Sequence, residues 1–124
     1  MYLIDKRIIS RAQRCIRCLP LNLKFYRDIQ EQGMQSELIF LQRDIYCLDN
    51  KSWFKSPDEL EITFRWLIMV GILRREVDGQ GLTSKVRLTP LGREILEKNP
   101  KLPLQKANSI EKIINFFSCL WALK

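Results

Sequence analysis

Residues 56 to 71 limit the possible folds more than any other segment, because they carry signals for both ends of one helix. Ser56 can cap the first turn, Pro57 suits the first helical position, and Glu59 completes a capping box. Gly71 suits the left-handed conformation in which many helices end. We therefore predict a helix between Ser56 and Gly71. Its inward side should carry Leu60, Phe64, Leu67 and Ile68.

The pattern changes after this helix. Residues 72–77 and 85–89 favour strands, and the Asp-Gly-Gln-Gly turn at residues 78–81 joins them into a hairpin. Thr89 followed by Pro90 repeats the cap and proline, which predicts a further helix to about Lys98. Residues 99–103 contain two prolines and should form a stiff linker.

Three more helices are predicted before residue 50. The first spans residues 3–19 and ends before Pro20, and the second spans residues 21–32 and closes at Gly33. Ser36 opens the third, which should reach Leu48. The residues that recur at helical intervals along this third helix are Leu38, Leu41, Ile45 and Leu48.

A last helix is predicted from Ser109 onward, and it is too apolar to lie alone on a protein surface. A second subunit could cover this helix. In a monomer, the helix could instead fold back onto the other apolar side of the capped helix, where Ile62, Trp66 and Met69 lie. We favour dimerisation. The residues expected at that interface are Ile110, Ile113, Ile114, Phe117, Leu120 and Trp121.

The order of a capped helix, a glycine, two strands around a glycine turn and a second capped helix resembles the winged-helix fold. Residues 64–75 resemble the end of a recognition helix entering the first wing strand, and residues 86–96 resemble the second wing strand and the helix after it. With helices on both flanks, the chain is similar to the PadR-type bacterial transcriptional regulators.

The resemblance implies a mainly α fold with a small β-hairpin, a winged helix-turn-helix with extra N- and C-terminal helices. It implies one domain over residues 1–124. Residues 1–33 would form basic N-terminal helices, residues 34–99 the winged-helix core, and residues 104–124 a C-terminal dimerisation helix. A homodimer of this kind would place the capped helix in the major groove of double-stranded DNA and the wing on flanking phosphates.

The positive charge of the chain favours binding to a polyanionic partner, because the net charge is +7 and the sequence pI is near 9.5. The candidate DNA-binding residues come from the capped helix and the wing: Lys55, Ser56, Thr63, Arg65, Arg74, Arg75, Gln80, Lys85 and Arg87. Asp58 and Glu61 depart from the pattern, since acids on a recognition helix repel phosphate. DNA contact is therefore expected to depend more on the wing and the basic first helix.

The first helix carries Lys6, Arg7, Arg11, Arg14 and Arg17 around an apolar stripe. These cations could bind the DNA backbone, an acidic protein or, least favoured, a membrane surface, and they could equally form a solvated face. The alternative to DNA binding is a winged-helix module for protein–protein interaction, which would use the acidic stripe and the apolar side of the capped helix.

Residue types argue against an enzyme. The chain has no histidine, and no nucleophile with a base or phosphate loop is apparent, so we expect no catalytic residues, cofactor or metal. The four cysteines, Cys15, Cys18, Cys47 and Cys119, are interpreted as mostly buried small apolar side chains with reduced thiols. No apolar run is long enough to span a bilayer, so we expect a cytoplasmic protein without membrane contact.

Overall fold

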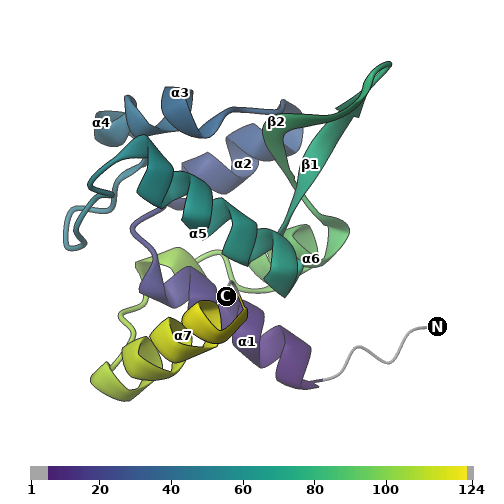
Figure 1. Ribbon diagram of the computed structural model, residues 1–124. Coiled ribbons are helices and arrows are strands. Elements are labelled where there is room, and N and C mark those ends of the chain that lie inside the picture. Colours follow the sequence, from purple (N-terminus) through teal and green to yellow (C-terminus); the bar gives the residue numbers. More distant parts are fainter. Residues whose placement is uncertain (1–5, 123–124) are drawn as a thin grey trace.

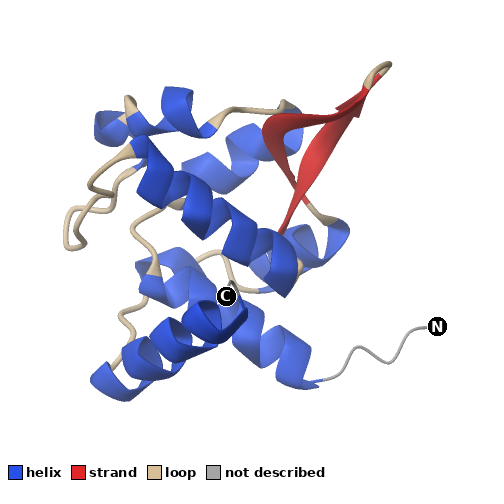
Figure 2. Cartoon of the chain, in the orientation of Figure 1, coloured by secondary structure: helices blue, strands red, loops and turns tan. Residues whose placement is uncertain are grey.

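The computed structural model describes residues 6–122 of the 124-residue chain. Over that range it forms seven α-helices, a short 3₁₀-helix and one antiparallel hairpin that projects from the helical body (Figures 1 and 2). The predicted mainly helical chain with a small hairpin is confirmed. The elements are α1 Lys6–Cys18, α2 Leu23–Glu31, α3 Ser36–Phe40, α4 Arg43–Tyr46, α5 Pro57–Val70, β1 Leu73–Asp78, β2 Gly81–Leu88, α6 Pro90–Lys98, η1 Leu102–Leu104 and α7 Ser109–Ala122.

Helix α5 forms where its end signals predict it. The Ser56 hydroxyl accepts a hydrogen bond from the Glu59 backbone N–H at 3.1 Å, and Gly71 ends the helix with a φ of 95°. The Glu59 carboxylate accepts from the backbone N–H of Lys55 at 3.0 Å, which is one residue earlier than in the usual capping box. Three of the predicted inward residues, Leu60, Phe64 and Leu67, are fully buried, and Ile68 is half-buried.

The hairpin is longer than predicted, because β2 begins at Gly81 and not at Lys85. Asp78 pairs with Gly81 across a two-residue turn, and the Asp78 carboxylate accepts from the Gln80 backbone N–H at 2.7 Å. β2 also pairs with Met34 through backbone hydrogen bonds between Met34 and Val86. The segment before α3 is therefore tied to the hairpin.

Helix α6 packs directly on the base of the hairpin. Thr89 caps it by accepting from the Gly92 backbone N–H at 3.0 Å, as the sequence predicts. A Cβ atom at Gly92 would lie 2.8 Å from both the Ile72 carbonyl oxygen and a methyl group of Leu88. Only glycine permits this approach of helix and sheet.

The prediction of one helix over residues 36–48 is wrong. The segment forms two short helices, α3 and α4, and Leu38, Leu41 and Ile45 are exposed while Ile39 is buried. The cap residue is also Gln35 and not Ser36. Because the backbone turns between the two helices, the helical phase does not continue across the break, and spacing alone cannot show which side faces inward.

The core lies between α2, α5 and the hairpin, with α1 packed against it. Phe25 of α2 stacks on Phe64 of α5 with ring centroids 5.9 Å apart. Ala12, Cys15 and Ile16 bury one side of α1 completely. The predicted helix of residues 3–19 is confirmed from Lys6 onward, and its first three residues lie outside the described range.

The segment after α6 is part of the packed body. Leu102 and Pro103 are buried, and η1 lies against α1. The ammonium group of Lys51 lies within hydrogen-bond distance of four backbone carbonyls, which share its three N–H donors: those of Arg17 at 2.6 Å, Leu19 at 3.0 Å, Pro103 at 3.1 Å and Gln105 at 3.3 Å. This one side chain joins the end of α1 to the segment that leads into α7.

Candidate interaction surfaces

Helix α7 begins at a capping box formed by Asn108 and Glu111. The Asn108 side-chain oxygen accepts from the Glu111 backbone N–H at 2.7 Å, and the Glu111 carboxylate accepts from the Asn108 backbone N–H at 3.4 Å. The sequence carries this signal as Asn-x-x-Glu, and the prediction of a start at Ser109 did not use it. The cap fixes where α7 starts on α1.

The side of α7 that faces the body is polar. The Arg17 guanidinium forms an ion pair with Glu111, and the Cys15 thiol donates to the Asn115 side-chain oxygen at 3.1 Å. The Trp66 indole N–H points at the same Asn115 oxygen at 3.4 Å. The Arg17 hydrogen bond holds the pKa of Glu111 below its usual range. Helices α1, α5 and α7 therefore meet at a small polar cluster.

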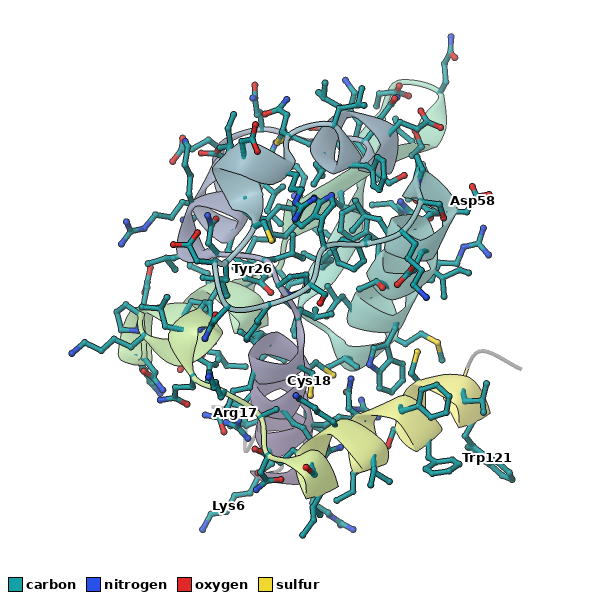
Figure 3. All side chains as sticks on the ribbon, turned by 90° about the vertical axis from the view of Figure 1, so that its left-hand side faces the viewer. Lys6, Arg17, Cys18, Tyr26, Asp58 and Trp121 are labelled. Carbon is teal, nitrogen blue, oxygen red and sulfur yellow. The ribbon has the colours of Figure 1, made fainter. Side chains whose placement is uncertain are left out.

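The opposite side of α7 is apolar and faces outward, and Figure 3 shows Trp121 pointing away from the body. Trp121 is 84% exposed, and even the least exposed member of the set, Ile114, is 42% exposed. We name this set the α7 apolar face: Ile110, Ile113, Ile114, Phe116, Phe117, Leu120 and Trp121. It contains every predicted dimerisation residue and adds Phe116, which the sequence prediction omitted.

The candidate DNA-binding residues on α5 have local partners or lie beside acids. Ser56 is engaged in the cap, and the Thr63 hydroxyl donates to the Glu59 carbonyl at 3.1 Å. Arg65 is well exposed and lies 3.6 Å from the Glu61 carboxylate. Lys55 is exposed just before the helix. This end of α5 presents mixed charge.

Arg75 and Arg87 are engaged in holding the hairpin in place. Arg75 pairs with Glu61 of α5 and donates to the Ser84 carbonyl at 2.9 Å, and its side chain is only 18% exposed. Arg87 pairs with Glu76 at 3.2 Å and donates to the carbonyl of Gln30 in α2 at 2.8 Å. Phosphate contact by either residue would break these bonds.

The strand register divides the remaining wing residues between two faces. Arg74 lies opposite Arg87, and Arg75 lies opposite Val86, so successive pairs point to opposite sides of the sheet. Lys85 therefore lies on the same side of the sheet as Arg74 and Arg87. Arg75 lies on the other side, where it pairs with Glu61 of α5. Arg74 and Lys85 are exposed, as is Gln80 in the turn. The structure does not bring the candidate DNA-binding residues together on one surface.

Between α3, α5 and the hairpin lies a pocket of about 400 Å³. Its lining includes the carboxylates of Glu37, Asp58 and Glu61, together with Arg65 and Arg75, which both pair with Glu61. The exposed side chains of Ile62 and Met69 lie along the same helix. This surface is more acidic and apolar than a phosphate-binding surface.

A family model of Npun_F0494-like proteins matches residues 2–119. The chain belongs to the Npun_F0494-like family. Searches of curated proteins and of solved structures returned no match. The family is one of unknown function.

Two arginines of α1 in this Npun_F0494-like chain are used by the fold. Arg17 pairs with Glu111, and the Arg11 guanidinium lies 5.9 Å from the centre of the Trp66 ring. Lys6 remains exposed at the start of α1. The basic character of α1 thus contributes to packing of α5 and α7 as well as to net charge.

The cysteines of this Npun_F0494-like chain are free thiols. Burial raises the pKa of Cys15 to about 12, and burial also raises the pKa of Cys18 and Cys119. Thiols of this kind stay protonated near neutral pH. Within residues 6–122 no cluster of three metal-ligating side chains occurs, and no helix there is long and apolar enough to cross a membrane.

Proposed function

We propose that this protein is a homodimeric protein-binding module of the winged-helix type, assembled through the α7 apolar face. The observation that carries the proposal is the exposure of seven large apolar side chains along one side of a single helix. Monomeric proteins rarely leave so continuous an apolar surface in water. A partner that covers it gains the free energy of removing that surface from solvent.

A second copy of the chain is the partner that fits this face. The α7 apolar face contains only Ile, Phe, Leu and Trp side chains, and the interfaces of homodimers are more apolar than those of transient complexes. Glu111 and Asn115 lie on the other side of α7, where they contact α1 and α5. A two-fold axis that passes through this face would bury the α7 apolar faces of the two copies against each other.

The winged-helix assignment is supported by the order and contacts of the central elements. Helices α3 and α5 precede a hairpin, and Met34 pairs with Val86, which joins the segment before α3 to that hairpin. The ion pair between Arg75 and Glu61 connects the hairpin to α5. This order of elements and these contacts support the proposal that residues 64–75 and 86–96 belong to a winged helix.

A protein partner suits the α5 side better than DNA does. Arg75 and Arg87 are engaged within the chain, and the hairpin turn at residues 78–81 contains an aspartate and neither lysine nor arginine. Several apolar side chains on α3, the turn after α3, α5 and the hairpin are exposed instead. They are Leu38, Leu41, Ile62, Met69, Val77 and Leu82.

DNA binding is the second candidate, and the net charge of +7 favours it. Arg74 and Lys85 on the outer side of the hairpin, with Lys55 and Arg65, are exposed cations that phosphates could reach. The dimer would present two copies of this set, as the resemblance to PadR-type regulators implies.

The dimer is tested by light scattering of the purified chain at micromolar concentration. We expect a dimer for the wild type and a folded monomer for the double variant Phe117→Ser, Leu120→Ser. The matched control, Leu41→Ser with Leu82→Ser, removes two leucines elsewhere that are even more exposed, at 79% and 76%, and should remain dimeric. A wild-type monomer, or a dimer that survives the α7 substitutions, would overturn the proposal.

The choice between protein and DNA is tested by mobility shift against genomic fragments over a range of salt concentrations. A protein-binding module should show no retention at physiological salt. Specific retention with a steep salt slope would establish the DNA-binding candidate instead. In that case Arg74→Ala and Lys85→Ala should each flatten the slope by about one unit, because each variant neutralises one phosphate fewer.

A further inference from the structure

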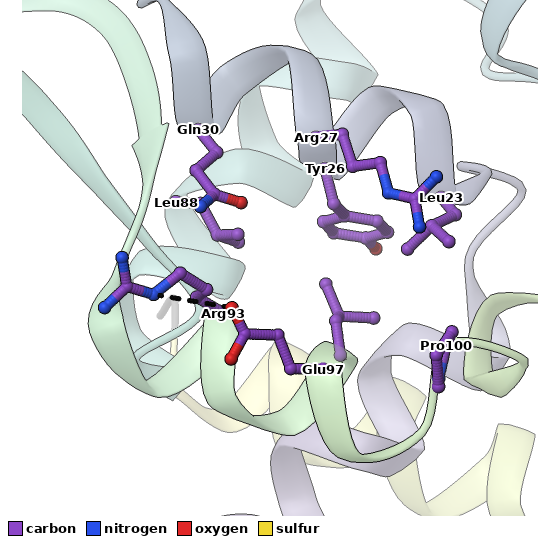
Figure 4. Close-up of a pocket in the computed structure, with 9 residues that line it drawn as sticks. Leu23, Tyr26, Arg27, Gln30, Leu88, Arg93, Glu97 and Pro100 are labelled. Carbon is purple, nitrogen blue, oxygen red and sulfur yellow. Dashed lines mark ion pairs between the residues drawn. The ribbon is translucent and has the colours of Figure 1, made fainter.

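A pocket of about 240 Å³ lies between α2, α6 and the segment after α6 (Figure 4). Its apolar wall includes Leu23, Leu96 and Pro100. The pocket is on a different part of the chain from the α7 apolar face and from the α5 side. None of the dimerisation or DNA-binding candidates lines it.

The phenol of Tyr26 is the unusual feature of this pocket. Tyr26 is fully buried, and its hydroxyl has no hydrogen-bond partner within the described part of the chain. Figure 4 shows the ring on the pocket wall with its oxygen directed into the pocket. Burial also raises the pKa of this hydroxyl well above its usual range, so it remains a neutral donor. A buried hydroxyl without a partner is costly unless something in the pocket accepts its hydrogen bond.

A cation accompanies the phenol. Arg27 lies one residue after Tyr26 on α2, is exposed, and forms no ion pair within residues 6–122. Arg93 lines the other side, where its Nε is 3.9 Å from the Glu97 carboxylate. A guanidinium without an ion pair, a neutral hydroxyl donor and an apolar wall that line the same pocket match a molecule with an anionic head and an apolar body.

We propose that this pocket binds a small amphipathic carboxylate. The carboxylate accepts hydrogen bonds from the Tyr26 hydroxyl and the Arg27 guanidinium, and the apolar body packs on Leu23, Leu96 and Pro100. This site goes beyond the proposed function, because neither the dimer nor its partner depends on it. A water molecule could satisfy Tyr26 alone, but it would leave the apolar wall and the guanidinium unused.

The test is calorimetric titration of the full chain with octanoate and hexanoate, with octanol as the neutral analogue. We expect saturable binding of at least one carboxylate and about tenfold weaker binding of octanol, because octanol lacks the charge-assisted hydrogen bonds. Tyr26→Phe and Arg27→Gln should each weaken carboxylate binding severalfold. Lys24→Gln, which removes a cation from the same helix outside the pocket, should bind as the wild type does.

Three results would overturn the site. They are no binding of either carboxylate, equal binding of octanoate and octanol, or unchanged binding in both folded variants. Tyr26→Phe removes an unpartnered hydroxyl and keeps the ring, so we expect it to fold, and its circular dichroism spectrum checks this. Arg27→Gln is a surface change and provides an independent readout if the first variant does not fold. The oligomeric state does not enter any of these measurements.

Discussion

Among single residues outside the apolar core, Lys51 holds distant segments of the chain together through its side chain. Its ammonium group is surrounded by the carbonyl oxygens of Arg17, Leu19, Pro103 and Gln105. Two of these carbonyls lie at the end of α1, where backbone acceptors lack partners within the helix. Partial burial lowers the pKa of Lys51, but the oxygens around it compensate the charge.

We predict that Lys51→Met lowers the free energy of unfolding by about 2–3 kcal/mol, because four carbonyls lose a charged donor while the aliphatic chain is kept. Urea denaturation followed by circular dichroism measures the change. Lys55→Met, which removes an exposed lysine nearby, should change stability by less than about 0.5 kcal/mol. Equal effects of the two substitutions would show that the hydrogen bonds of the Lys51 ammonium group contribute nothing.

Among the elements, α7 is held against α1 and α5 by polar contacts. Glu111 both caps its first turn and pairs with Arg17, and Asn115 receives hydrogen bonds from Cys15 and Trp66. The apolar side of α7 contributes little to this docking, because it faces solvent. Protonation of one carboxylate can therefore weaken the attachment of the whole helix.

We predict that α7 detaches from α1 on acidification. The folded structure lowers the pKa of Glu111, so its contribution is fully present above the ordinary glutamate pKa of about 4.3 and is lost as pH falls through the lowered value. The Trp66 indole N–H resonance in NMR spectra reports the change, since that group points at Asn115 of α7.

Glu111→Gln should shift the same Trp66 resonance already at neutral pH. Glu94→Gln is the control, because Glu94 forms only an exposed pair with Lys98 on α6. If Trp66 keeps its wild-type resonance in Glu111→Gln, the ion pair with Arg17 does not hold α7.

For the molecule as a whole, folding and association are expected to be linked. The monomer buries a core around Phe25 and Phe64 but leaves the α7 apolar face in water. A dimer covers that face only in the folded state, so mass action stabilises the fold as protein concentration rises.

We predict that the Tm of the wild type rises by a few degrees for each tenfold increase in protein concentration. Each such increase raises the free energy of unfolding of a dimer by about 1.4 kcal/mol. Differential scanning calorimetry measures this. The Phe117→Ser, Leu120→Ser variant should show a Tm that does not depend on concentration. A concentration-independent Tm in the wild type would contradict the dimer.

Local sequence signals were sufficient to predict α5, α6 and the presence of the hairpin, although β2 begins at Gly81 and not at the predicted Lys85. The limits of these elements depend on contacts between residues a few positions apart, such as the Ser56 and Thr89 caps and the turn between Asp78 and Gly81. The exposed apolar side of α7 could also be predicted, because helical spacing groups its residues before any neighbour is known.

Only the tertiary structure shows which arginines are engaged in hydrogen bonds and ion pairs, and which of the other apolar side chains are exposed. Arg75 and Glu61 are 14 residues apart, and Arg87 and Gln30 are 57 apart, so no local pattern shows that these cations are engaged. The break between α3 and α4 likewise turned Leu38 and Leu41 outward. Tyr26 lines a pocket only because α6 and Pro100 close around it. Such contacts follow from how distant elements pack, which spacing along the chain does not determine.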